Sequence, residues 1–347
     1  MDPRGTPART SPARPAARLS RRALLRMASI AAAAVPARAL GEERMRILGL
    51  LTGLPLSDPL MSRDSPRFKT LFGDLARSGW IEGRNLRVEM RSSAGGPGAR
   101  ETAVRELIAL KPDVVITVSS TETAALLAQT RTIPIVFATA GDPVGSGFVE
   151  SLARPGGNAT GFVAGDAEPG CKLLQFLREA SPRLSRVGVF LNPLSSPRGG
   201  RYYLDPIESA AIELGLKVTP VHLTDPSQIE AAVAAYADGP ESGIAIPIDS
   251  FLVAHRRVLV EAMTRYRVPA IYPYRYFMEV GGLMSYGPSL EVRAAEYVDL
   301  ILRGAKPAEL PVQSPRRYEL LINRKAAQAL GLILPLSLLA RADQIIE

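Results

Sequence analysis

From Met45 onward, short apolar segments alternate with longer amphipathic ones. The first apolar segments follow one another at residues 46–52, 85–90, 113–118, 133–139 and 159–164. Stretches with a helical period lie between them, for example 67–79 and 100–110. Apolar runs this short, separated by helices, are typical of strands buried on both faces of a parallel sheet. The pattern therefore predicts an α/β fold with a doubly wound parallel sheet.

The same alternation then repeats. Further apolar segments lie at residues 186–192, 217–223, 243–248, 268–274 and 282–287. Helical patterns between them occupy residues 202–215, 225–237 and 250–266. From the first strand to the fourth, one set runs over 46–134 and the other over 186–269, which are nearly equal lengths. Equal order and equal length predict two doubly wound parallel-sheet lobes of the same topology, and the chain is long enough for two domains.

The chain continues past the second set. A helix, a proline-rich connector, a strand and a second helix are predicted in turn over 289–304, 305–315, 318–323 and 324–332. We expect lobe 1 to comprise 45–164 with part of 288–317 returning to it. Lobe 2 would comprise 165–287 with part of 318–347. Two lobes joined by several crossings form a hinged clamp with a cleft between them.

Candidate ligand contacts follow from the topology, because doubly wound sheets bind ligands beyond the carboxyl ends of their strands. The residues at those ends are Thr52, Gly53, Ser119, Ser120, Thr121, Gly141, Asp142, Asn192, Asp249, Tyr272, Tyr274 and Tyr286. Structural interpretations stand beside this one. Ser119 and Glu122 have the spacing of a capping box, and Asp249 or Ser250 suits a helix cap. Asp142 suits a turn, and the rings of Tyr272 and Tyr274 suit packing. Convergence on one predicted cleft favours ligand contact.

Enzyme chemistry finds little support in the sequence. The glycine-rich stretch 140–162 is not a phosphate loop, because Glu150 stands where a dinucleotide fingerprint needs its third glycine. The single cysteine, Cys171, can form no internal disulfide. His222 ends a predicted strand, and His255 lies in a predicted helix. No cluster has the spacing of metal ligands. We therefore predict neither an enzyme nor a bound cofactor or metal.

The net charge of +8 is concentrated at the N-terminus. Residues 1–39 hold eight arginines and one acid, so the rest of the chain is close to neutral. The basic balance therefore gives no reason to expect nucleic-acid binding.

The N-terminal segment 1–39 has the features of an export signal. Arg21 and Arg22, with the following leucines, resemble a twin-arginine signal. The apolar run 27–37 is too short to span a bilayer, which needs about 20 residues. Residues 37–39 suit a cleavage site, which predicts a periplasmic protein beginning near Leu40, cleaved near Ala39. A disordered tail, and a translation start further downstream, remain alternatives.

Longer motifs resemble a known family. They are GDPVGSGFVESLARPGGNATGF, GGLMSYGPSL, YELLINRKAAQALGL, LPLSLLARADQIIE, SGWIEGRNLRVE and IPIVFATAGDPV. Over 46–347 the chain resembles the ABC transporter substrate-binding family that includes tryptophan- and tyrosine-type binders. The resemblance implies a type I periplasmic binding protein fold: two lobes, three crossings and a ligand in the cleft, without enzymatic activity. It further implies a turn at 141–143, a helix over 148–158 and a last strand of lobe 1 at 159–164.

The resemblance also implies partners. We expect a monomer that delivers a small solute to a membrane permease driven by a cytoplasmic ATPase. The alternative is a secreted ligand-sensing subunit for a membrane receptor. An α/β enzyme lacks an activated base or nucleophile, and a repressor of this fold would need a DNA-binding helix pair where the leader lies. The chain departs from the family at Glu122 and at 194–200, which both border the cleft.

The expected solute is small and polar or zwitterionic, an amino acid or similar, with an apolar or aromatic group. Hydroxyl groups and helix-start amides at 119–121 suit a carboxylate. Asp249, or Asp142 in its place, suits an ammonium group, and the candidate tyrosines suit a ring or a cation. This clamp requires the Glu122 side chain to turn toward the backbone of its own capping box. Groups on opposite lobes would meet only when the cleft closes.

Overall fold

The computed structural model describes residues 44–165, 169–237, 241–288 and 294–347. Backbone contacts separate residues 1–44 from one compact unit, 45–347, and it is this unit that is described below. The expected leader, 1–39, and the start of the helix expected over 289–304 lie outside the described residues.

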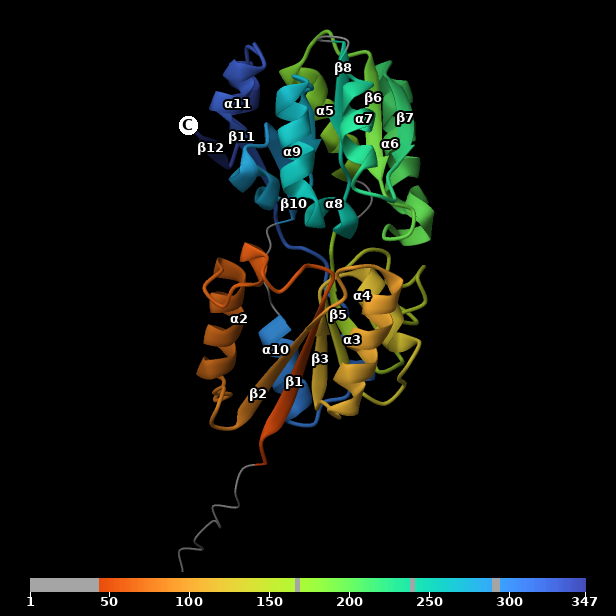
Figure 1. Ribbon diagram of the computed structural model, residues 1–347, viewed down its shortest axis with the longest axis vertical. Coiled ribbons are helices and arrows are strands. Elements are labelled where there is room, and N and C mark those ends of the chain that lie inside the picture. The colour runs from red at the N-terminus through yellow and green to blue at the C-terminus, as the bar shows by residue number, and fades with distance from the viewer. Residues whose placement is uncertain (1–43, 166–168, 238–240, 289–293) are drawn as a thin grey trace, which may run out of the picture. The chain divides into compact units, whose positions relative to one another are not determined.

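Lobe 1 contains a five-stranded, wholly parallel sheet with the strand order β2-β1-β3-β4-β5 (Figure 1). Its strands are β1 (Arg46–Thr52), β2 (Leu86–Ser92), β3 (Val114–Thr117), β4 (Ile135–Ala140) and β5 (Ala159–Val163). Leu50, Ile116 and Phe137 on the three central strands are fully buried. Burial on both faces explains why these strands appear in the sequence as continuous apolar runs.

Helices cover the sheet of lobe 1. They are η1 (Pro59–Met61), α2 (Pro66–Arg77), α3 (Pro97–Ala109) and α4 (Ser120–Leu127). Helix α2 begins where Ser65 accepts a hydrogen bond from the Phe68 amide, with a proline in the first helical position. Phe68, Leu71 and Leu75 follow at helical spacing and are buried. The helix predicted over 67–79 is thus confirmed.

Lobe 2 contains a seven-stranded sheet with the order β12-β11-β10-β9-β8-β6-β7. Its strands are β6 (Arg186–Leu191), β7 (Lys217–His222), β8 (Ser242–Ala245), β9 (Ala270–Tyr272), β10 (Met284–Pro288), β11 (Tyr318–Asn323) and β12 (Gln344–Ile346). Strands β10 and β11 are antiparallel, whereas the sequence predicted parallel pairing throughout. Strand β11 enters from the connector that returns from lobe 1, and not through a helical crossover within lobe 2, so it is free to run in the opposite direction.

The helices of lobe 2 are α5 (Pro169–Ala180), η2 (Pro197–Gly200), α6 (Arg201–Leu214), α7 (Gln228–Ala234), α8 (Ser250–Ala254), α9 (Arg256–Arg265), η3 (Arg275–Val280), α11 (Arg324–Ala329) and α12 (Leu336–Leu339). The helix predicted over 250–266 is divided into α8 and α9. His255 lies between them with a non-helical φ of −104° and ψ of 20°. Its ring packs on Phe251, with the ring centroids 4.5 Å apart.

The chain passes between the lobes three times. After β10 it returns to lobe 1 as α10 (Ala294–Leu302) and η4 (Pro307–Glu309), and then re-enters lobe 2 as β11. The Trp80 indole donates to Asp299 Oδ1 of α10 at 2.7 Å. Thr160 of β5 donates to the Leu310 carbonyl at 2.5 Å, which ties the connector to the edge of the lobe 1 sheet. These crossings agree with the two-lobed arrangement that the family resemblance implies.

The helix expected over 148–158 is wrong. The segment forms bends and irregular backbone instead, in which the Glu150 amide donates to the Pro155 carbonyl and the Ser151 amide to the Arg154 carbonyl. Proline disfavours a helical conformation at the residue before it, and the two glycines that follow Pro155 have low helix propensity. The last strand of lobe 1 follows as β5, as expected.

Candidate functional site

A cavity lies between the two sheets and is lined from both lobes. It holds about 720 Å³ of space free of protein atoms, its opening to solvent included. Lobe 1 contributes the loops that follow β1, β3 and β4 and the start of α2, and lobe 2 the loops that follow β6, β8 and β9.

Seven of the sequence-predicted contacts line this cavity. They are Thr52, Gly53, Ser119, Ser120, Gly141, Asp249 and Tyr274. All lie at or just beyond the carboxyl ends of strands, and both lobes contribute. The topological rule therefore selected residues that the fold brings together, although what they bind is a separate question.

The other five predicted contacts do not line the cavity: Thr121, Asp142, Asn192, Tyr272 and Tyr286. Tyr272 is buried and stacks on Phe277, with ring centroids 4.7 Å apart. The Tyr286 ring packs on Phe176 and Tyr318 at centroid distances of 5.0 and 5.7 Å. Both rings therefore pack on neighbouring aromatic side chains, which for Tyr272 is the alternative interpretation from the sequence.

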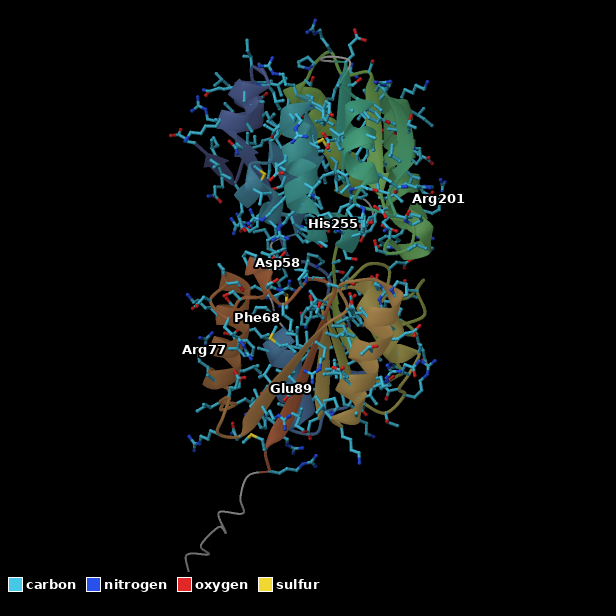
Figure 2. The ribbon with its side chains drawn as sticks, in the orientation of Figure 1. Asp58, Phe68, Arg77, Glu89, Arg201 and His255 are labelled. Carbon is cyan, nitrogen blue, oxygen red and sulfur yellow. The ribbon has the colours of Figure 1, made fainter. Side chains whose placement is uncertain are left out.

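Two ion pairs among the described residues join the lobes. Asp58 of lobe 1 accepts two hydrogen bonds from the Arg256 guanidinium of lobe 2, at 2.7 and 3.0 Å. Asp142 of lobe 1 lies 2.9 Å from Arg198 Nε of lobe 2. Figure 2 labels Asp58 and His255, the neighbour of Arg256, on facing ends of the two lobes. In each pair lobe 1 supplies the carboxylate, so the facing surfaces have complementary charge.

Gly141 lies directly against lobe 2. A Cβ atom there would come within 2.6 Å of Pro197 Cγ and of the Tyr203 hydroxyl, closer than such atoms approach. Glycine is therefore required while the lobes have this arrangement. The next residue, Asp142, has a φ of 42° and accepts a hydrogen bond from the Gly145 amide at 3.0 Å. That hydrogen bond closes the turn that was predicted from the sequence.

The start of α4 is organised by hydroxyl groups. Ser119 Oγ accepts a hydrogen bond from the Thr121 amide at 3.2 Å. The Glu122 carboxylate is buried and accepts hydrogen bonds from the Ser93 and Ser119 hydroxyl groups. The expectation that Glu122 turns to the backbone is thus corrected, because hydroxyl groups are its partners. Glu122 does not line the cavity.

Asp249 lines the cavity with a fully engaged carboxylate. Oδ1 accepts from the Leu252 amide at 3.0 Å and Ser195 Oγ at 3.1 Å. Oδ2 accepts from the Asn192 amide at 2.8 Å and Ser196 Oγ at 2.7 Å. Burial raises the pKa of Asp249 above its ordinary value, and these hydrogen bonds oppose the rise. Asp249 caps α8 and ties it to the loop after β6, which also accounts for the buried position of Asn192.

Among the cavity residues that were not predicted from the sequence are Arg67, Tyr203 and Tyr276. Arg67 lies in the first turn of α2, Tyr203 in the first turn of α6, and Tyr276 in η3. The topological rule was applied only to the few residues directly after each strand, and these three lie further along the chain. A search extended to the first turn of the next α-helix would have found Arg67 and Tyr203.

Tyr203 and Tyr274 are neutral hydrogen-bond donors that line the cavity. Burial raises the pKa of Tyr203 well above its ordinary value, and the nearby Tyr274 raises it further. Burial also raises the pKa of Tyr274, although the positive charge of Arg67 lowers it. The phenol groups thus keep their protons near neutral pH and can donate them to a bound acceptor.

Metal and membrane-spanning features are absent from the described part of the chain. Among its histidine, cysteine, aspartate and glutamate side chains, no three gather in a way that would hold a metal ion. Within the same ranges, no helix is both long and apolar enough to cross a bilayer.

Residues 67–346 match the family described as "ABC transporter substrate binding protein". The chain belongs to this family. The resemblance inferred from the motifs is therefore confirmed, and so is the type I periplasmic binding protein fold. Proteins of the family bind small molecules outside the cytoplasm, work with ABC permeases and are not enzymes.

Relatives of this substrate-binding protein include solved structures. A conserved domain protein from Vibrio cholerae O1 biovar El Tor strain N16961 is 27% identical, with a TM-score of 0.78 over 87% of this chain and 100% of that chain. An ABC domain from Streptococcus pneumoniae in complex with L-Trp is 24% identical, with a TM-score of 0.76 over the same shares. A tyrosine-binding protein from Clostridioides difficile strain R20291 is 22% identical over 264 residues, 74% of each chain.

Proposed function

We propose that this protein is the solute-binding component of an ABC importer and captures a small solute in the cavity between its lobes. The observation that carries the proposal is the shared cavity. Loops from both sheets line it, and direct contacts between the lobes accompany it. A solute there would touch both lobes only in the closed arrangement, so its binding would favour closure.

The proposed moving bodies are the two lobes expected from the sequence. Lobe 1 is 45–164 with part of 288–317, and lobe 2 is 165–287 with part of 318–347. Closure would bring Gly141 against lobe 2 and form the two ion pairs. All these contacts join one lobe to the other, so an opened form would lose them together. A bound solute would add further contacts between the lobes in the closed form.

The proposed solute is an amino acid or a similar zwitterion with an apolar or aromatic group. The cavity wall combines polar groups with apolar side chains, among them Leu54, Leu60, Val118 and Ile248. The S. pneumoniae relative was solved with L-Trp, and the C. difficile relative is a tyrosine-binding protein. Both names support this solute class for the present chain.

The proposed cellular setting is the periplasm. Residues 1–39 would direct export and be cleaved near Ala39, leaving a monomer that meets its permease at the membrane. Mass spectrometry of the periplasmic fraction should then show a chain beginning near Leu40. A soluble cytoplasmic protein that retains Met1 would contradict export.

A thermal-shift screen tests solute binding. The probes are amino acids, nucleosides, small carboxylates and sugars, each at a hundredfold excess over a micromolar dissociation constant. A true ligand stabilises the fold by about 2.7 kcal/mol at that excess. We expect amino acids of the aromatic or apolar class to raise the melting temperature. Stabilisation by sugars alone would contradict the solute class, and no stabilisation by any probe would contradict solute capture.

Loss of uptake of the identified solute in cells without this protein tests the importer role.

A further inference from the structure

The charges that face the cavity are not equally available to a ligand. Of the side chains that line it in the described part of the chain, Arg67 is the one base and Asp249 the one acid. The Asp249 oxygens each accept two hydrogen bonds from the protein. A carboxylate has about four acceptor sites, so Asp249 has little capacity left for a ligand ammonium group.

Arg67, in contrast, is available to a ligand. It lies in the first turn of α2 and is half-buried, and no carboxylate of the described residues pairs with it. It lines the cavity together with Tyr274 and other residues of lobe 2, so it lies near the lobe boundary. A guanidinium carries five N–H donors and no acceptor, and the planar pair of donors matches a carboxylate.

Two buried hydroxyl groups add to this excess of donors. Tyr203 and Tyr276 line the cavity, and their side chains are 3% and 8% exposed. Neither hydroxyl group has a hydrogen-bond partner among the described residues. Leaving a buried hydroxyl group unpaired costs about 1–3 kcal/mol, so an acceptor on a bound solute would recover that energy.

The serines first expected to hold a carboxylate are already engaged. Ser119 accepts from the Thr121 amide and donates to Glu122. Ser120 accepts from the Gly141 amide at 2.9 Å. The side-chain donors that the described residues leave unpaired in the cavity therefore include Arg67 and the two tyrosines, whereas the Ser119 and Ser120 hydroxyl groups are engaged.

We infer that Arg67 anchors the carboxylate of the solute, with hydroxyl donors from lobe 2, and that the site has no charged partner for an amino group. The ligand class is then apolar or aromatic monocarboxylates, with or without an amino group. This inference rests on the proposed function, because it states which charged group of the ligand the same cavity binds. It predicts that removing the amino group from a ligand costs little affinity, whereas removing the carboxylate abolishes binding.

Calorimetric titration of the full chain with three matched probes tests this inference. L-Tryptophan carries both charges, indole-3-propionate only the carboxylate and tryptamine only the ammonium group. We expect the first two to bind with dissociation constants within about tenfold of each other and tryptamine not to bind, since only the carboxylate has a charged partner.

Variants localise the effect. Arg67→Met should weaken binding of both carboxylates by about 30-fold, as expected for loss of a charge-assisted hydrogen bond, and Arg67→Lys should restore part of the affinity. The matched control is Arg275→Met, because Arg275 lines the groove next to the cavity with Arg67 but not the cavity itself. It should bind as the wild type does.

Outcomes separate this inference from the proposed function. If tryptamine binds as tightly as indole-3-propionate, or Arg67→Met binds as the wild type does, the inference is wrong and solute capture stands. If the wild type binds a sugar or nucleoside but no carboxylate, the inference and the amino-acid class both fail, and solute capture still stands. If no probe of any class binds, the proposed function fails and the inference with it.

Discussion

Replacing Asp58 with asparagine should weaken solute binding without unfolding either lobe. Asp58 is held by two hydrogen bonds from Arg256, and the two side chains are 12% and 4% exposed. Asparagine keeps the size of the side chain and an oxygen that can accept from the Leu60 amide, the other partner of Asp58. The charge is lost, and Arg256 would be left buried without its counter-ion in the closed form.

The expected loss of affinity follows from the fact that the ion pair between Asp58 and Arg256 forms only when the lobes close. At an effective dielectric constant of about 20, two unit charges about 4 Å apart attract by roughly 4 kcal/mol, and desolvation offsets part of that. Truncating one partner of a buried pair costs about 2–5 kcal/mol. The opened form would expose both groups to water, so the cost falls on closure. Taking about 2 kcal/mol, the apparent dissociation constant should rise about 30-fold.

The assay combines calorimetry with thermal melting. The control is Glu82→Gln, which removes an exposed pair with Arg63 inside lobe 1 and should leave affinity unchanged. Burial raises the pKa of Asp58, but hydrogen bonds and charge from Arg256 outweigh burial and leave it below the ordinary 3.8. Because the pKa of Asp58 is lowered by the pair, the pair contributes its full free energy to closure above pH 3.8, and this contribution is lost as the pH falls further. The affinity gap between wild type and Asp58→Asn should therefore narrow only below about pH 4. Equal affinities at neutral pH would refute the reasoning.

Two further variants separate closure from folding. Gly141→Ala adds a methyl group that meets Pro197 of lobe 2, at a backbone conformation open to alanine. For Gly141→Ala, calorimetry should show at least about tenfold weaker binding, with a melting temperature within about 1 °C of wild type. The control is Gly73→Ala, because there is room for a methyl group at Gly73. Unchanged affinity of Gly141→Ala would mean that the lobes need not meet at Gly141. Asp249→Ala leaves buried donors unpaired and should destabilise the fold by about 3–5 kcal/mol in a thermal melt. Any loss of affinity should be equal for tryptophan and indole-3-propionate, and a loss confined to tryptophan would restore Asp249 as an ammonium partner.

Periodicity was enough to predict most of the fold. Short apolar runs became strands, and the near-equal spans of the two sets reflect two lobes with related topology. The segment 148–158 shows the limit, because its apolar residues Phe148 and Val149 anchor a turn and not a helix. Strand β11 shows another, since direction depends on where the connector enters the sheet and not on the residues of the strand.

The site was predictable only in part. Strand ends can be located from the pattern, so Ser119 and Asp249 could be placed at the cavity. Which groups are already engaged depends on side-chain geometry, and Ser195 and Ser196 supply partners for Asp249 that no spacing rule identifies. The pairing of Asp58 with Arg256 joins residues 198 positions apart and follows only from how the lobes meet.

A crystal structure of the chain with its tightest-binding carboxylate tests the central claim most directly. The account predicts ligand density in the cavity between the lobes, with the carboxylate on Arg67 and the ion pair between Asp58 and Arg256 formed. Ligand density on the outer surface of one lobe, or in the cavity with the lobes apart and that ion pair broken, would contradict it.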